Sequence, residues 1–335
     1  MNAAAPAGGR VVVAPNWLGD CVMALPVLRA IRRAHPQDGL AVLARSGAAN
    51  LFLAEGSADT VVERSGILRD VRRLRRERFA EAWLLPNSFR SALAPWLAGI
   101  PERIGYDTDF RGPLLTRRLK EPRRTEHQLR DYDALLRSRG IEPDLEAPRV
   151  PVTARALDRA ASSLDAAGVD RDGPLALLAP GAAFGWTKRW PPDRYAALGD
   201  LLAARGLGCA VVIGPGEEKL GAAVAASARA RLPVVGADLD PLELLALLSC
   251  ARVVVANDSG PMHLAAGVGV PVVAFFGPTD PGRTAPTGAP SRVLDRYVFC
   301  SPCYLKQCPY GHECMREITV EMALQAVEEV LGGRW

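Results

Sequence analysis

The sequence of 335 residues has no long hydrophobic run, no long polar tract and no strong excess of one charge. Its longest apolar stretch, residues 242–256, is interrupted by Glu243 and Arg252, so it cannot span a bilayer alone. Residues 1–6 lack a basic segment followed by an apolar one, which argues against a secretory signal. The composition of the chain, 49% hydrophobic and 23% charged residues, excludes a disordered protein and a coiled-coil rod. We therefore expect a soluble cytoplasmic protein.

The net charge of +4 is too small to indicate a nucleic-acid-binding protein. The charge is uneven, however, because residues 1–150 contain 24 basic and 18 acidic residues, whereas the remainder contains 17 and 19. Much of the excess lies in two arginine-rich runs, residues 72–78 and 117–124. Either run alone is typical of a solvated helix face. A bias across the whole first half indicates an acidic partner or an anionic membrane surface.

Short apolar runs alternate with helix-period segments along nearly the whole chain. Runs with so little polar alternation are typical of strands buried on both faces of a parallel sheet. The pattern predicts an α/β protein with two doubly wound parallel-sheet domains and a cleft between them. The proline-rich segment before residue 151 and the Gly-Pro pair before the strand at residue 175 indicate a boundary near residues 151–173, so we assign residues 1–165 and 166–335 to the two domains. The predicted strands are residues 10–14, 40–43, 82–85, 175–179, 209–213, 253–256 and 270–276, and the clearest helices are 194–205, 241–250 and 320–331.

The loop after the first predicted strand, residues 15–20, contains one glycine and one carboxylate, that of Asp20. It is neither a glycine-rich dinucleotide fingerprint nor a phosphate-binding P-loop. Asp20 stands where a strand turns into a helix, at the expected cleft. It could act as a general base or simply cap the N-terminus of the helix, and the spacing leaves both interpretations open.

A loop in the second half, residues 180–192, combines two glycines with Thr187 and Lys188. A lysine in a glycine-containing loop after a strand indicates an anion site, and we expect Lys188 to bind phosphate.

The loop after the strand at residues 209–213 ends in Glu217 and Glu218. Either carboxylate could hold ribose hydroxyls, or both could be solvated acids that favour the dipole of a helix.

Residues 257–263 follow another predicted strand and begin a helix, with Ser259 as its expected N-cap and Pro261 in its first turn. The N–H groups and the dipole of such a helix predict a site for a phosphate or diphosphate. Asp258 would repel that phosphate, so we expect it to face neutral hydroxyls such as those of a sugar. His263 alone would be an ordinary structural histidine.

Four of the seven cysteines lie close together in the sequence, at positions 300, 303, 308 and 314, near His312. In a reducing compartment, such a cluster binds metal more often than it forms disulfides. Cys300, Cys303, Cys308 and Cys314 could form a structural zinc site, although they lack paired Cys-x2-Cys knuckles. An iron–sulfur cluster and simple free thiols are the alternatives.

Three of these loops together resemble the lipopolysaccharide heptosyltransferase family, glycosyltransferase family 9, in order, spacing and strand–loop context over nearly the whole chain. The Asn-Trp pair before Leu-Gly-Asp is closer to the type II members of the family than to type I. The matching segments are Pro15-Asn-Trp-Leu-Gly-Asp20, Phe184-Gly-x-x-Lys-Arg-Trp-Pro191 and Asn257-Asp-Ser-Gly-Pro-Met-His263.

The resemblance implies a GT-B fold, in which two Rossmann-like domains face each other across a central cleft, and an inverting transfer of heptose from ADP-heptose to the inner-core heptose of Kdo-lipid A. Asp20 would be the general base and Lys188 would assist the departing diphosphate. No cofactor is expected for catalysis, and the enzyme would work at the cytosolic face of the inner membrane, in peripheral contact with its anionic surface. The donor-binding residues implied are Thr187, Lys188, Glu218, Asp258, Ser259, Gly260 and His263.

Three alternatives remain at this point. A type I enzyme of the same family would add heptose to Kdo. A nucleotide-sugar epimerase or dehydrogenase should carry Gly-x-Gly-x-x-Gly after the first strand, which residues 15–20 do not. A non-catalytic, two-lobed nucleotide-sugar-binding protein would usually be exported.

Overall fold

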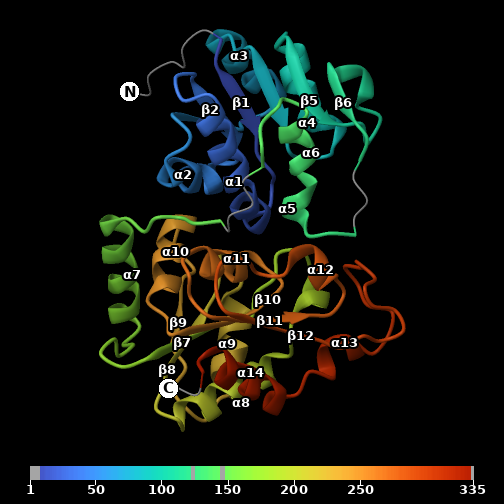
Figure 1. Ribbon diagram of the computed structural model, residues 1–335. Helices are drawn as coiled ribbons and strands as arrows, with labels where there is room; N and C mark the ends of the chain where they lie inside the picture. The colour runs from blue at the N-terminus through green and yellow to red at the C-terminus, as the bar shows by residue number, and fades with distance from the viewer. Residues whose placement is uncertain (1–7, 122–124, 144–147, 333–335) are drawn as a thin grey trace. The chain divides into compact units, whose positions relative to one another are not determined.

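The computed structural model describes residues 8–121, 125–143 and 148–332, and the chain divides into two compact units, Met1–Val150 and Pro151–Trp335 (Figure 1). The division falls before residue 151 rather than after residue 165, because helix α7 (Ala154–Ala166) packs against α10 (Pro241–Ser249) of the second unit. Two arginines of the second basic run, at positions 123 and 124, lie outside the described residues.

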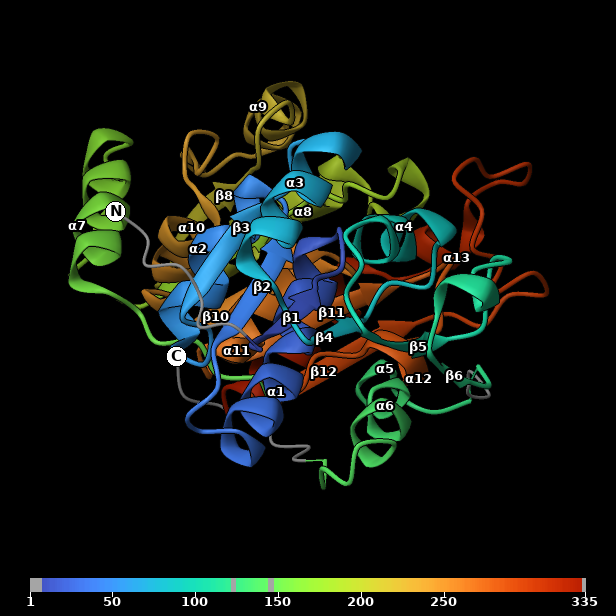
Figure 2. The same ribbon diagram turned by 90° about the horizontal axis from the view of Figure 1, so that it is seen from above.

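The first unit is a parallel six-stranded sheet in the order β3-β2-β1-β4-β5-β6. Helices α1 and α2 pack together on one face, and α3 and α4 pack together on the other (Figure 2). The strands are β1 (Arg10–Val13), β2 (Leu40–Ala44), β3 (Thr60–Glu63), β4 (Glu81–Leu84), β5 (Glu102–Tyr106) and β6 (Arg117–Leu119). The helices are α1 (Leu18–Ala34), α2 (Ser46–Glu55), α3 (Ile67–Glu77), α4 (Phe89–Leu97), η1 (Gly112–Leu114), α5 (Gln128–Asp131) and α6 (Asp133–Arg137).

The second unit repeats this plan with the order β12-β11-β10-β7-β8-β9. Numbered from its own first strand, each sheet has the order 3-2-1-4-5-6, the doubly wound arrangement that the sequence predicted. The strands are β7 (Leu175–Ala179), β8 (Gly208–Val212), β9 (Val234–Val235), β10 (Val253–Asn257), β11 (Val272–Phe276) and β12 (Ser291–Asp295). Besides α7 and α10, the helices are η2 (Trp186–Lys188), α8 (Pro192–Ala203), α9 (Glu218–Ser227), α11 (Gly260–Gly267), α12 (Pro281–Thr284), α13 (Glu313–Arg316) and α14 (Val320–Val330).

Burial explains which strands the sequence revealed. Strands β2, β4, β7, β10 and β11 are buried at every position, as expected for the interior of a parallel sheet covered on both faces. Three of the four edge strands, β3, β6 and β12, are partly or mostly exposed and carry charged residues, so no apolar run marked them. The fourth, β9, has only two residues. None of the helices formed by the described residues combines the length and apolar character needed to cross a membrane.

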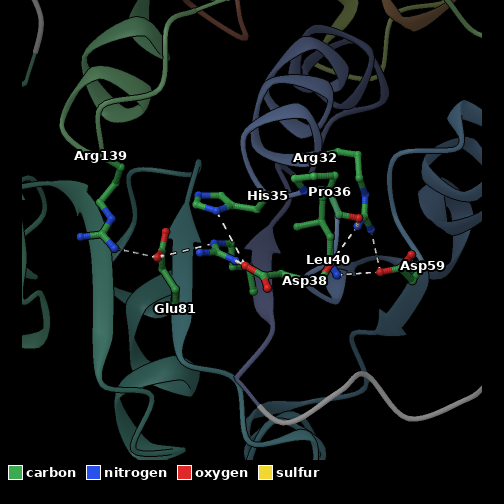
Figure 3. Close-up of polar contacts among 9 residues, drawn as sticks. Arg32, His35, Pro36, Asp38, Leu40, Asp59, Glu81 and Arg139 are labelled. Carbon is green, nitrogen blue, oxygen red and sulfur yellow. Dashed lines mark hydrogen bonds and ion pairs between the residues drawn. The ribbon is translucent and has the colours of Figure 1, made fainter.

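A network of charges holds the amino-terminal edge of the first sheet together (Figure 3). Arg10, at the start of β1, pairs with Asp38 before β2 and lies 3.7 Å from Glu81 at the start of β4. Arg139 reaches the same buried Glu81 carboxylate at 3.1 Å, and His35 lies 3.7 Å from Asp38. The opposite edge of the sheet, where the strands end, carries the loops in which the sequence predicted functional residues.

Candidate active site

Asp20 lies in the first turn of α1, shortly after the end of β1. The N-cap residue of this helix is Trp17, so the alternative in which Asp20 caps the helix is wrong. The side chain is half-buried, and its Oδ1 accepts a hydrogen bond from Gln128 Nε2 at 3.2 Å. Gln128 begins α5, which packs against α1, so the carboxylate is oriented while remaining accessible.

A pocket of about 280 Å³ opens beside Asp20. Its walls are the loop after β1, the loop after β4 and the α5 region. Trp17 is 50% exposed here, which places a flat indole close to a carboxylate and amide side chains. Such a combination of apolar face and hydrogen-bonding groups suits a sugar. The lining residues are Pro15, Asn16, Trp17, Asp20, Leu85, Pro86, Asn87, Ser88, Gln128 and Tyr132.

The loop after β4 is held in place by Arg111, which is fully buried. Its Nη1 donates to Ser91 Oγ at 3.0 Å and to the Pro86 carbonyl, and its Nε donates to the Tyr106 carbonyl at 2.8 Å. Burial lowers the pKa of this guanidinium to about 10, which leaves it charged at neutral pH. No local motif marks Arg111 among the many arginines of this half, so sequence reasoning missed it.

In the second unit, Lys188 and Asp258 form a buried ion pair. Lys188 Nζ lies 2.5 Å from Asp258 Oδ2, and Thr279 Oγ1 donates to the same carboxylate oxygen at 2.7 Å. Lys188 Nζ also lies 5.0 Å from the centre of the Phe184 ring. The sequence predicted separate ligands for Lys188 and Asp258. The structure joins them, and an ammonium group with three N–H donors can keep this partner and still bind another acceptor.

The segment after β10 begins α11 at Gly260, and Ser259 occupies its N-cap position. The prediction of Ser259 as the N-cap residue is confirmed, but its side chain does not bond to the helix, because its Oγ donates to the Asn257 carbonyl at 3.1 Å instead. The N-terminal end of α11 therefore keeps its positive partial charge without a side-chain cap. His263, one turn into the helix, is buried.

Asn257 is a fully buried residue that connects this segment to the loop after β7. Its Oδ1 accepts hydrogen bonds from the backbone N–H of Trp190 at 3.0 Å and from the Tyr195 hydroxyl at 3.1 Å. Its Nδ2 donates to the Pro180 carbonyl at 2.8 Å. Its position next to Asp258 was visible in the sequence, but its role in fixing the loop was not.

Thr187 is buried, and its hydroxyl donates to the Leu305 carbonyl at 2.7 Å. Its own carbonyl accepts a hydrogen bond at 2.6 Å from Nε2 of His312, whose ring nitrogen must carry the proton. Thr187 thus ties the Lys188 loop to the cysteine-rich segment.

The two candidate ribose carboxylates differ in their surroundings. Glu217 is partly buried, where its Oε2 accepts from Gly214 N–H at 3.0 Å and its Oε1 lies 3.8 Å from Arg189. Its carboxylate also lies against Gly181, where any side chain would collide with it. Glu218 is exposed at the start of α9, and its Oε1 accepts from Gly216 N–H at 3.1 Å. Glu217 is therefore held by the two loops, whereas the contact of the exposed Glu218 lies within its own turn.

The four clustered cysteines line one small cavity, of about 20 Å³, together with His312. All four thiols are unpaired, and burial raises the pKa of the Cys314 thiol to about 11. Within the described part of the chain, no three histidine, cysteine or acidic side chains are arranged to hold a metal ion. The expectation of a zinc site at Cys300, Cys303, Cys308 and Cys314 is therefore not supported.

Comparisons with known proteins place this chain in a family. The model of glycosyltransferase family 9 (heptosyltransferase) matches residues 67–313. Lipopolysaccharide heptosyltransferase 2 of Escherichia coli is 30% identical, and that of Salmonella typhimurium 28%, each alignment covering 96% of this chain and 98% of the relative. The solved E. coli ADP-heptose lipopolysaccharide heptosyltransferase II has a TM-score of 0.84 at 25% identity, covering 96% of this chain and 98% of that one. The resemblance found in the sequence is confirmed, and the chain is a glycosyltransferase that belongs to glycosyltransferase family 9, the heptosyltransferase family.

Proposed function

We propose that this enzyme transfers heptose, with inversion, from ADP-heptose to the inner-core heptose of Kdo-lipid A. The observation that carries the proposal is the meeting of Lys188, Asp258 and the N-terminal end of α11 at the carboxyl edge of the second sheet. This edge offers positive charge for a diphosphate and a carboxylate for sugar hydroxyls. The full-length similarity to type 2 enzymes favours a heptose acceptor over Kdo itself.

In the reaction that we propose, Asp20 is the general base. Its carboxylate takes the proton from an acceptor hydroxyl as that oxygen bonds to the anomeric carbon of the heptose. The bond from this carbon to the diphosphate breaks at the same time, and ADP leaves with the electron pair. The accessible Asp20 carboxylate, oriented by Gln128, supports this role.

Lys188 and α11 would stabilise the charge that grows on the departing ADP. Asp258 fixes the Lys188 ammonium, whose remaining N–H groups can face the diphosphate beside Ser259, Gly260 and His263. We assign the ribose hydroxyls to the exposed Glu218 and heptose hydroxyls to Asp258. Thr187 would act by positioning Lys188, because its hydroxyl is directed at Leu305. The activated donor supplies its own leaving group, so no cofactor enters this scheme.

The direct test is incubation of the enzyme with ADP-heptose and two defined acceptors, followed by mass analysis of the lipid product. One acceptor ends in Kdo and the other carries one heptose on Kdo. We expect addition of a single heptose to the second acceptor. Addition to the Kdo acceptor instead would favour the type I reaction, and binding of ADP-heptose without transfer to either would favour a binding protein.

We also propose peripheral contact with the anionic inner-membrane face, because the acceptor is lipid-linked and residues 1–150 carry a basic excess. Sedimentation with anionic and with zwitterionic vesicles tests this, and equal binding to both would contradict it.

A further inference from the structure

The cysteine-rich segment, residues 300–314, contacts the Lys188 loop, residues 180–192, at two points of one residue. Thr187 Oγ1 donates to the Leu305 carbonyl at 2.7 Å, and the Thr187 carbonyl accepts from His312 Nε2 at 2.6 Å. Only 2% of the surface of Thr187 is exposed. Both hydrogen bonds are therefore shielded from water, and breaking either would leave a buried polar group without a partner.

The bond from His312 acts on the backbone from which the Lys188 side chain extends. The Thr187 carbonyl and the Lys188 N–H belong to the same peptide group, which is planar and rotates as one unit. On its other side, the Lys188 N–H donates to the Gly185 carbonyl at 3.3 Å, within the short helix η2. A hydrogen bond that fixes the Thr187 carbonyl thus also fixes the direction in which the backbone of Lys188 continues.

The imidazole of His312 is itself held in place. His312 has a left-handed backbone, with φ 59° and ψ 35°, a conformation that is uncommon in residues other than glycine and costs free energy. Its ring packs edge-on against that of Trp186, with 4.9 Å between the ring centres. Its carbonyl accepts a hydrogen bond from Arg316 N–H at 3.0 Å, in α13. The fold thus maintains an unfavourable backbone conformation that brings this ring to the Lys188 loop.

The same segment also contacts the loop that follows β11. Tyr304 N–H donates to the Pro278 carbonyl at 2.7 Å. The residue after this proline, Thr279, donates from its hydroxyl to Asp258 Oδ2, the oxygen that also pairs with Lys188. The cysteine-rich segment is therefore bonded beside Lys188 on one side and beside the hydrogen-bond donor of Asp258 on the other.

The cysteines pack at the junction of these contacts. Thr187, Pro278 and His312 line the cavity of about 20 Å³ together with the four thiols. A cavity of this size has room for about one water molecule. Gly277 permits the close approach, because a Cβ at this position would lie 2.9 Å from Cys314 Sγ. A junction packed this closely transmits a displacement of the segment to both loops.

We propose that the cysteine-rich segment is a positioning element of the donor site and that His312 is its positioning residue. His312 acts through Thr187: it fixes the peptide group that precedes Lys188, so that the ammonium faces the diphosphate while it stays paired with Asp258. The inference rests on the proposed function, which gives Lys188 its role at the diphosphate.

The first experiment compares the binding of ADP to His312→Gln and His312→Leu by calorimetry. The amide of Gln can donate to the Thr187 carbonyl and Leu cannot, whereas both variants share the left-handed backbone and lose the ring contact with Trp186. We expect His312→Leu to raise the Kd of ADP about fivefold or more, the usual effect of one buried hydrogen bond, and His312→Gln to stay within about twofold of the native value. Equal affinities of the two variants would overturn the role of this bond.

Phe299→Leu is the control for a general disturbance of the segment. The Phe299 ring is 78% exposed and packs against that of Tyr310, with 4.8 Å between the ring centres. We expect this variant to bind ADP with native affinity. A loss as large as that of His312→Leu would mean that any disturbance of the segment weakens binding, and would overturn the assignment of His312.

A second pair of variants repeats the test at the other contact, and serves if His312→Leu melts below the assay temperature. Thr187→Ser keeps the hydroxyl that donates to the Leu305 carbonyl, and Thr187→Val removes it with little change of shape. We expect weaker ADP binding in the Val variant alone. Equal affinities in this pair would overturn the role of the segment.

A mutant cycle separates positioning from a merely structural role. His312→Leu is introduced into the native protein and into a Lys188→Met/Asp258→Asn background. If His312 acts through Lys188, the change should weaken ADP binding little in the second background, because no ammonium is left to position. The same fold-loss in both backgrounds would overturn the proposal. In steady-state kinetics, His312→Leu should raise the donor KM and leave the acceptor KM unchanged.

The binding measurements need no acceptor, which keeps this inference apart from the proposed function. Native ADP affinity in the Lys188→Met/Asp258→Asn protein would contradict the proposed function. Weak binding by that protein together with native affinity in His312→Leu would contradict this inference alone.

Discussion

Lys188 Nζ lies 2.5 Å from Asp258 Oδ2, although 70 positions separate the two residues in the sequence. Both side chains are nearly buried, with 14% and 6% of their surface exposed. Each of these charges would be costly without the other, so the pair acts as a unit in both stability and donor binding.

Lys188→Ala should lower the free energy of unfolding by about 3–5 kcal/mol, because it leaves the Asp258 carboxylate buried without its partner. The Lys188→Met/Asp258→Asn double variant should recover most of this loss. It should still bind ADP-heptose poorly and turn over slowly, since the ammonium is missing. Denaturant unfolding and donor titration of the three proteins measure both effects. A stable, fully active double variant would remove Lys188 from the mechanism.

Asp20→Asn should lower turnover by about 10²–10⁴-fold, because an amide cannot accept the proton of the acceptor hydroxyl. Folding should change little, since Asp20 lies in the first turn of α1 and is not its N-cap. The measurement is product formation with both substrates saturating, and calorimetric binding of ADP-heptose is the control. Normal turnover in the Asn variant would show that another group takes the proton.

Glu218→Ala should raise the KM for ADP-heptose about tenfold, the effect of one hydrogen bond to a charged group, with little change in turnover. Glu217→Gln is the comparison, because the amide can keep the bond to Gly214 N–H. Steady-state kinetics with varied donor distinguish the two. A larger effect of the Glu217 change would assign the ribose contact to Glu217.

Glu81→Gln should destabilise the first unit by about 3 kcal/mol, because the buried Glu81 carboxylate lies near Arg139 (Figure 3) and also near Arg10. The network lies at the amino edge of the sheet, opposite the loops of the candidate site, so the KM values should stay unchanged. Chemical unfolding together with kinetics at low temperature tests both statements. Loss of acceptor affinity in the folded variant would contradict the expectation that a change at the amino edge of the sheet leaves the candidate site intact.

Stability should fall as the pH is lowered through the range of histidine titration. Burial holds the pKa of His312 below its ordinary value of 6.5, so the folded state binds this proton less readily than the unfolded state does. The stabilisation is complete above pH 6.5 and is lost as the pH falls through the folded pKa.

The measurement is the melting temperature between pH 7.5 and 5.5 for the native protein and for His312→Asn, since Asn tolerates the left-handed backbone at this position. We expect a smaller decrease in the variant. The pKa of His35 is also lowered by burial, so a His35→Gln protein shows that residue's share. Parallel decreases in the native and His312→Asn proteins would rule out a contribution from His312.

The apolar runs of the sequence were sufficient to predict the strands that are buried at every position in the two sheets. Residues 175–179 form the predicted strand without change, and the other buried strands differ by a few residues at their ends. A strand covered on both faces must be apolar along its length, and this requirement is visible locally. The loops of interest followed directly, because ligand loops lie where parallel strands end. The proline-rich segment that ends at residue 151 indicated a boundary in this region, but the assignment of α7 to the second unit depends on its packing against α10, which the local sequence does not specify.

The partners of the site residues were decided by tertiary structure alone. Local spacing indicated that Lys188, Asp258 and Asp20 stand in loops, but it contains no information on which side chain from another loop each would meet. The Lys188–Asp258 pair, the contacts of Asn257 and the burial of Arg111 arise because a parallel sheet carries the chain back across its face between successive strands.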